Sequence, residues 1–144
     1  MRAVIMSLVV ASGLSALAAQ DTVAQQAEAE MLARGLTGTE LILVDADAGV
    51  EVARGAILSP SIDLCTLSLM WTGGEDVVVN LGGLRFVQGD GVGSLGVRET
   101  APGRPEMIFV IGEPRYAEAL ASFQAMGRIC GSSLAAAPPL VVSD

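Results

Sequence analysis

Between residues 40 and 111 the chain consists of short β-prone runs separated by turn residues, and this pattern limits its possible folds more than any other feature. Runs of this kind occupy residues 40–54, which predict a hairpin around a turn at 45–49, and residues 62–71, 77–79, 84–88, 92–98 and 107–111. Because no helical segment separates these strands, they favour a largely antiparallel sheet over a doubly wound nucleotide-binding fold.

The run at 62–71 shows which side of the sheet is buried. Cys65, Leu67, Leu69 and Trp71 occupy alternate positions, with Thr66 and Ser68 on the other face, because side chains two positions apart share one face of a strand. We therefore expect a single strand here, with Cys65 on the face that contacts the core.

Helical patterns flank the strands on both sides. The first covers residues 21–34, with a capping box from Thr22 to Gln25 and Gly35 as its stop. Its thin apolar face comprises Ala24, Ala27, Met31 and Ala33.

The second helix is expected at 114–130, between Pro114 and Gly131. Its apolar stripe comprises Tyr116, Leu120, Phe123, Gly127 and Cys130. The sequence thus predicts an α+β fold in which an N-terminal and a C-terminal helix flank an antiparallel sheet of about five to seven strands.

The two cysteines predict a disulfide between the sheet and the second helix. Cys65 shares a strand face with Leu67, and Cys130 ends the helical stripe. Such a bond would stabilise the fold by roughly 4 kcal/mol on a chain-entropy model. The alternative, a redox-active pair, usually needs a Cys-x-x-Cys motif and an exposed thiol of low pKa, and the sequence shows neither.

Residues 1–19 are typical of a secretory signal peptide. Arg2 precedes an apolar run from Ile5 to Leu17, and small residues allow cleavage after Ala18 or Ala19. The run is too short for a permanent membrane anchor, which needs about 20 residues, so we expect no stable membrane insertion after cleavage. We expect one domain at 20–144 in the bacterial periplasm or secreted, with 132–144 as a frayed tail or a late edge strand.

Composition excludes several kinds of chemistry. The chain has no histidine and no lysine, which removes Ser-His-Asp and Cys-His mechanisms, ordinary catalytic zinc sites and Schiff bases. Its 16 acidic residues outnumber its eight arginines, so nucleic acid is a poor partner, whereas a basic protein or a neutral ligand suits the charge. Residues 89–96 are glycine-rich but match no phosphate-binding fingerprint, and we expect no cofactor.

A weak metal candidate lies in the turn of the first hairpin. Asp45, Asp47 and Glu51 are spaced like the start of a calcium-binding loop. The match ends there, because Val50 replaces the required glycine and Ala56 the closing acid. The simpler interpretation is a turn in which aspartate side chains accept hydrogen bonds from backbone amides.

Candidate binding residues lie at two other places. Trp71 ends a strand next to Glu75 and Asp76, and serves either as a contact for a partner or as part of the core. Those acids, with Asp63 and Asp90, are the only source of a carboxylate pair for glycoside-type hydrolysis. The proline-rich loop at 99–105 offers Glu99 and Arg104 as polar contacts for recognition, or is an ordinary connection.

These observations favour an exported, non-enzymatic interaction protein of the bacterial envelope, such as an accessory subunit, an inhibitor or a ligand-binding module. Its partner would be a protein or a small ligand. Two alternatives are a small carboxylate- or calcium-dependent hydrolase and a structural envelope component that self-associates through an uncovered sheet face.

Overall fold

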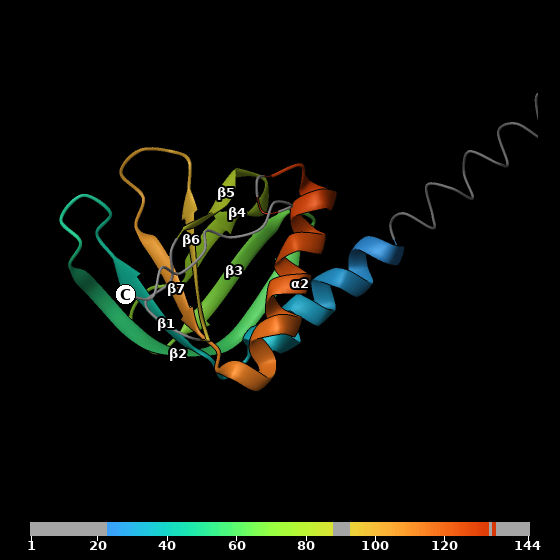
Figure 1. Cartoon of the computed structure of the whole chain (residues 1–144), viewed down its shortest axis with the longest axis horizontal. Coiled ribbons are helices and arrows are strands. Elements are labelled where there is room, and N and C mark those ends of the chain that lie inside the picture. The colour runs from blue at the N-terminus through green and yellow to red at the C-terminus, as the bar shows by residue number, and fades with distance from the viewer. Residues whose placement is uncertain (1–22, 88–92, 133, 135–144) are drawn as a thin grey trace, which may run out of the picture.

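A computed structural model describes residues 23–87, 93–132 and 134. The expected signal peptide, the turn at 89–91 and nearly all of the expected tail lie outside these residues. In the described part, the chain forms an N-terminal helix (residues 23–36), one seven-stranded antiparallel sheet and the C-terminal helix α2 (Glu113–Cys130), which confirms the predicted α+β fold (Figure 1). The remaining elements are β1 (Glu40–Val44), β2 (Glu51–Asp63), β3 (Thr66–Trp71), β4 (Val77–Asn80), the 3-10 turn η1 (Leu81–Gly83), β5 (Leu84–Val87), β6 (Ser94–Glu99) and β7 (Glu106–Val110).

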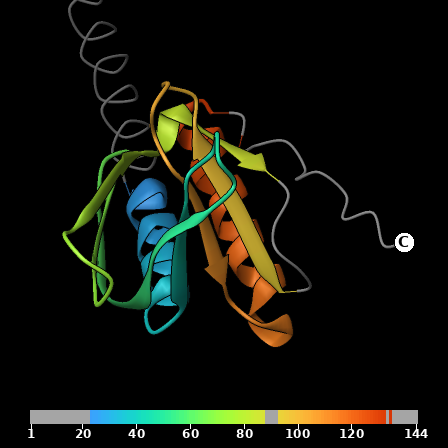
Figure 2. The same ribbon diagram turned by 90° about the vertical axis from the view of Figure 1, so that its left-hand side faces the viewer.

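The strand order across the sheet is β4-β3-β2-β1-β7-β6-β5, so β1 lies at the centre. In the register of the sheet, Leu41 stands opposite Gly55 of β2 and Phe109 of β7. The sheet is strongly curved, and both helices lie on its concave side (Figures 1 and 2). The edge strands β4 and β5 are joined in sequence by η1, so the chain crosses directly from one edge of the sheet to the other.

The core lies between the concave face of the sheet and the two helices. Phe123 of α2 is fully buried and contacts the rings of Phe86 in β5 and Phe109 in β7, with ring centroids 6.5 and 5.5 Å apart. The sheet contributes its alternate residues, as the pattern predicted: Leu41, Ile57, Leu67, Leu69, Trp71, Val79, Leu84, Phe86, Leu95, Val97, Met107 and Phe109.

The second strand is longer than the sequence indicated. The Ser59–Pro60–Ser61 segment, expected to separate two strands, is part of β2, where Pro60 stands opposite Leu69 of β3. β2 pairs with β1 only as far as Ala56, so beyond that residue one side of it has no strand partner. A proline lacks the N–H that a second partner would require, and it is tolerated for that reason on an unpaired side.

Conversely, the expected strand at 62–71 is interrupted. Leu64 and Cys65 form a two-residue turn between Asp63 of β2 and Thr66 of β3. The expectation that Cys65 lies within a strand was therefore wrong, although Leu67, Leu69 and Trp71 do share the buried face.

The N-terminal helix continues past its expected stop. Gly35 is helical, and the left-handed turn that follows uses Gly38, with φ of 79°. The expected apolar face was also wrong, because Met31 is half exposed while Leu32 and Leu36 are fully buried. Burial of Leu36 provides the reason for the extra turn, since it adds a large apolar side chain to the core.

Helix α2 has the predicted ends. Pro114 lies in its first turn, and Gly131 adopts the left-handed conformation that commonly closes a helix, with its N–H donating to the carbonyl of Gly127. Of the predicted stripe, Phe123 and Gly127 are buried, and Tyr116, Leu120 and Cys130 pack against the core.

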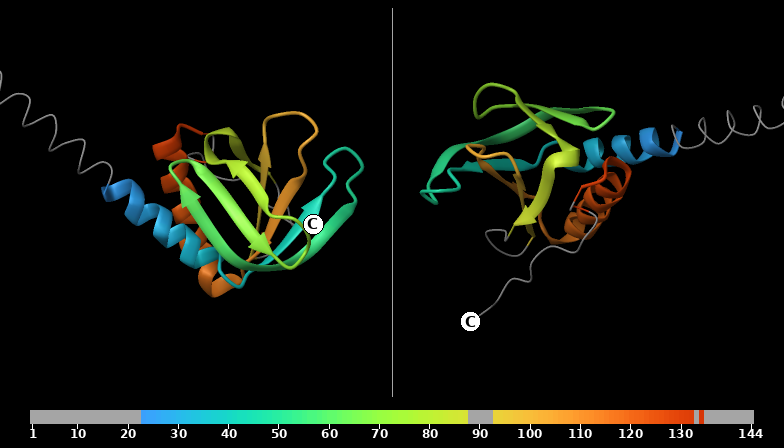
Figure 3. Two further views of the ribbon diagram at one scale, coloured as in Figure 1. Left: turned by 180° about the vertical axis from the view of Figure 1, so that it is seen from behind. Right: turned by 90° about the horizontal axis from the view of Figure 1, so that it is seen from above.

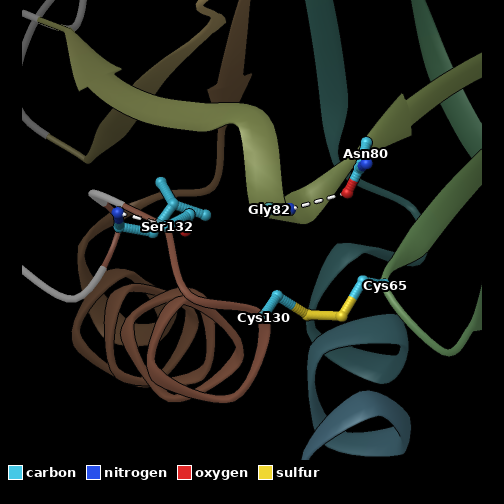
Figure 4. The surroundings of a disulfide bond; sticks show 6 residues. Cys65, Asn80, Gly82, Cys130 and Ser132 are labelled. Carbon is cyan, nitrogen blue, oxygen red and sulfur yellow. Dashed lines mark hydrogen bonds between the residues drawn. A yellow bond between two sulfur atoms is a disulfide. The ribbon is translucent and has the colours of Figure 1, made fainter.

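The disulfide is formed as expected, and Cys65 and Cys130 have their Cα atoms 5.9 Å apart. It joins the turn between β2 and β3 to the end of α2, next to η1 (Figure 4). The N–H of Leu81 in η1 donates to the carbonyl of Cys65 at 2.7 Å, and the side chain of Asn80 accepts from Gly82 at 2.8 Å. The disulfide therefore joins the hairpin to the end of the helix, and the hydrogen bond from Leu81 attaches the 3-10 turn to the same place.

We predict that Cys65→Ser lowers the free energy of unfolding by about 3–4 kcal/mol, because the unfolded chain loses a cross-link that closes a long loop. Urea titration followed by tryptophan fluorescence measures the change. The Cys65→Ser, Cys130→Ser double variant should match the single variant, since both break the same bond. Two reactive thiols in the purified wild-type protein would contradict this.

We also predict opposite effects for alanine at two glycines. A Cβ on Gly73 would lie 2.5 Å from the indole ring of Trp71, whereas one on Gly35 would meet no atom within 4 Å. Gly73→Ala should therefore destabilise the fold by about 1–3 kcal/mol through overpacking. Gly35→Ala should stabilise it by about 0.5–1 kcal/mol, because alanine favours the helix. The same urea titrations test both, and equal effects would refute the contact at Trp71.

Candidate functional site

Trp71 is part of the core. Its side chain is 5% exposed, and its indole N–H donates to the backbone carbonyl of Glu75 at 2.8 Å. The bond fixes the start of the turn between β3 and β4. This is the core arrangement considered above for a tryptophan whose N–H finds a carbonyl.

The candidate carboxylates do not form one group. Glu75 and Asp76 are exposed in the turn after β3, whereas Asp63 lies before the start of that strand. A six-residue strand spans about 20 Å, which separates Asp63 from the other two by far more than a catalytic carboxylate pair allows. Asp90 lies outside the described residues.

Glu99 and Arg104 contact each other and the edge of the sheet. The guanidinium of Arg104 forms an ion pair with Glu99 and also donates to the carbonyl of Val78 at 3.0 Å. The other carboxylate oxygen of Glu99 accepts from the N–H of Asn80 at 3.4 Å. Both residues thus bind backbone groups of the edge strand β4. Unpaired backbone groups at such an edge can otherwise pair with a strand of another chain.

In the hairpin turn, the side chains of two of the three candidate metal ligands, Asp45 and Glu51, have other partners. One carboxylate oxygen of Asp45 accepts from the N–H groups of Asp47 and Ala48, at 2.9 and 3.0 Å, and these bonds lower the pKa of Asp45. Glu51 forms an ion pair with Arg54, which also pairs with Glu40. The described residues hold no group of three or more Cys, Asp or Glu side chains placed to bind a metal ion.

A cleft that the sequence did not indicate opens between the N-terminal helix and the end of β2. Its volume is about 470 Å³. One wall comes from the helix and the other from residues 61–64, directly before Cys65. The lining residues are Gln25, Gln26, Ala29, Glu30, Ala33, Ser61, Ile62, Asp63 and Leu64.

Leu64 lies at the rim of this cleft, at the tip of the β2–β3 hairpin. Its side chain is 74% exposed, and its backbone has φ of 56°, in the left-handed region. For a residue with a bulky side chain this conformation costs about 1–2 kcal/mol relative to the usual ones. The next residue is the disulfide-bonded Cys65, so the tip is covalently tied to α2.

The cleft is acidic. Glu30 and Asp63 line it, both are exposed, and neither forms an ion pair with a described residue. No arginine is among the lining residues, although seven of the eight arginines lie in the described part of the chain. A cation that enters therefore meets two free carboxylates.

Two other surface features differ from this cleft. A groove of about 600 Å³ between the two helices has mixed charge, because Glu28 and Glu118 line it together with Arg34, Arg115 and Arg128. On the convex face of the sheet, opposite the core, Leu58, Met70 and Val78 are each about half exposed. We call these three residues the outer patch.

One signal for the hairpin tip was present in the sequence. Ile62 and Leu67 are both apolar, yet they are five positions apart, so one continuous strand would place them on opposite faces, whereas both contact the core. Only a turn between them allows this arrangement. The exposure of Leu64 and the cleft depend on where the N-terminal helix packs, which no local pattern reports.

Known proteins give no further guide to the site: the chain matches no protein-family model and no curated protein. Among the described residues, no helix is both long and apolar enough to cross a membrane.

We predict that Asp45→Asn weakens the fold near pH 7 and that this deficit disappears in acid. Backbone hydrogen bonds depress the pKa of Asp45 below 3.8, so the charged form contributes stability above that value and loses it as the pH falls through the folded-state pKa. Urea titrations of both proteins at about pH 7 and about pH 2 test this, and a deficit that is equal at both values would contradict it.

Proposed function

We propose that this chain is a non-enzymatic binding module that works outside the cytoplasm. The Cys65–Cys130 bond supports the location, because disulfides persist in oxidising compartments such as the periplasm and the extracellular space. The leader-like residues 1–19 support it independently.

The observation that carries the binding role is the cleft beside the disulfide. Its second wall ends at Leu64, and the disulfide begins at the next residue, so the cross-link directly restrains the lining of the cleft. A surface restrained before binding loses little conformational entropy when a partner arrives. This favours recognition as the role of the site.

The chemistry of the chain supports a non-enzymatic role. With no histidine or lysine, acid–base catalysis would fall mainly to carboxylates, and those of the sheet turns lie at opposite ends of β3. In the cleft, Glu30 and Asp63 are both exposed to water, and no other ionisable side chain of the described residues lines it.

Site-specific photo-crosslinking in cells tests the proposal. A photoreactive residue at Gln26, in the cleft, should give one defined adduct with a second protein, whereas the same residue at Asp76, at the far end of β3, should give none. Equal adducts from both positions, or none from Gln26, would refute a binding role for the cleft. Recovery of a reduced chain that still begins at Met1 would refute export.

The outer patch supports a second candidate function, self-association as a structural component of the envelope. Leu58, Met70 and Val78 are exposed on a sheet face that neither of the two described helices covers, and apolar side chains of this kind are common at interfaces. Figure 3 shows that face from behind the view of Figure 1. A photoreactive residue at Met70 that gives a covalent homodimer would favour this function, and a monomer at all concentrations would count against it.

A further inference from the structure

We infer that the cleft binds a basic segment of a partner protein that also carries apolar side chains, and that Leu64 is its apolar contact. This inference rests on the binding role proposed above, and it adds the chemistry of the partner and the residue that determines specificity. Leu64 is exposed, has a left-handed backbone conformation and is covalently restrained, and the cleft beside it is acidic.

The exposure of Leu64 is extreme for an apolar side chain. At 74% it exceeds that of every other large hydrophobic residue in the described part of the chain, of which Val23 comes next at 66%. Leu64 lines the cleft and is not among the residues that form the core or pack against it. Its removal should therefore cost the fold little.

The backbone conformation at position 64 makes the presence of a leucine there unusual. Among the described residues it is the only non-glycine with positive φ. Glycine or asparagine would adopt this conformation with less strain, and both are frequent at such turns. A leucine at this position lowers the stability of the fold and exposes apolar surface to water, so folding does not explain why a leucine is present. Contact with a partner explains its presence.

Covalent restraint makes this leucine an efficient contact. Cys65 is bonded to the end of α2, and its carbonyl accepts from the N–H of Leu81. The turn is therefore held from two directions. An apolar side chain on a rigid turn gains its full contact energy, because little backbone entropy is lost on binding.

The charge of the cleft selects the partner. Glu30 and Asp63 have no cationic neighbour within the lining, whereas Arg54, Arg98 and Arg104 are each paired with an acid elsewhere. The net charge of −8 adds long-range attraction for a cationic segment. The volume of about 470 Å³ suits a short segment, since ligand sites range from about 300 to 1,000 Å³.

Three fluorescent peptides of equal length provide the probes: one with alternating lysine and leucine among serines, one with glutamate in place of lysine, and one with serine in place of leucine. Fluorescence anisotropy with the full mature protein measures binding. We expect the lysine–leucine peptide to bind at least about tenfold more tightly than either of the others, because only it satisfies both the carboxylates and Leu64.

Two variants with matched controls separate this site from general attraction to an acidic protein. Glu30→Gln should weaken binding about threefold, whereas Glu28→Gln, on the same helix but lining the other groove, should not. Leu64→Asn should weaken binding about tenfold while raising the Tm by about 3 °C, because asparagine tolerates the left-handed backbone. Val52→Asn removes a similarly exposed apolar residue of β2, outside both the cleft and the outer patch, and should leave binding unchanged.

The outcomes distinguish this inference from the proposed function. Equal affinity for the lysine and glutamate peptides, or a Leu64→Asn protein that binds like wild type, would overturn the inference. If photo-crosslinking from Gln26 still captured a defined partner, the cleft would remain a binding site for a segment of different chemistry. If neither the peptides nor the crosslinker reported binding, both proposals would fail.

Discussion

The disulfide between Cys65 and Cys130 is the constraint on which the rest of the structure depends. The sheet is open, and its two edge strands, β4 and β5, are linked only by the short turn η1. The bond ties the end of α2 to the β2–β3 hairpin, next to η1. At η1 the chain passes from one edge strand of the curved sheet, β4, to the other, β5. The disulfide thereby holds α2 over the concave face of the sheet. Hydrogen bonds between strands cannot do this, because they do not reach the helix.

Polar contacts at the edge of the sheet complement that covalent constraint. Glu99 ends β6 and Arg104 lies in the connection between β6 and β7, yet both bind backbone groups of β4 at the opposite edge. They protect β4 from strand addition, a recurrent hazard of exposed edges. Two side-chain surfaces of the described residues differ in character: the cleft beside Leu64 is acidic and restrained, and the outer patch is apolar.

Individual residues show how far sequence reasoning reached. Period-two alternation identified the buried faces of the strands, and the cap residues placed α2 within one residue. The same reasoning missed the turn at Leu64, because Cys65 continued an apparent alternation. It proposed Glu99 and Arg104 as recognition residues on the basis of loop position. It did not indicate their contacts with β4, which are 19 and 26 positions away in the chain, because local patterns carry no information about such pairs.

By itself, the sequence determined the α+β class, the disulfide partners and the acidic, histidine-free chemistry, because periodicity, cysteine number and composition are local or additive properties. Only the tertiary structure decided where the N-terminal helix packs, that a cleft opens between it and the hairpin, and that a strained leucine stands exposed at its rim. Those features arise from contacts between segments distant in the chain. Their geometry depends on packing of the whole core, which no single segment encodes.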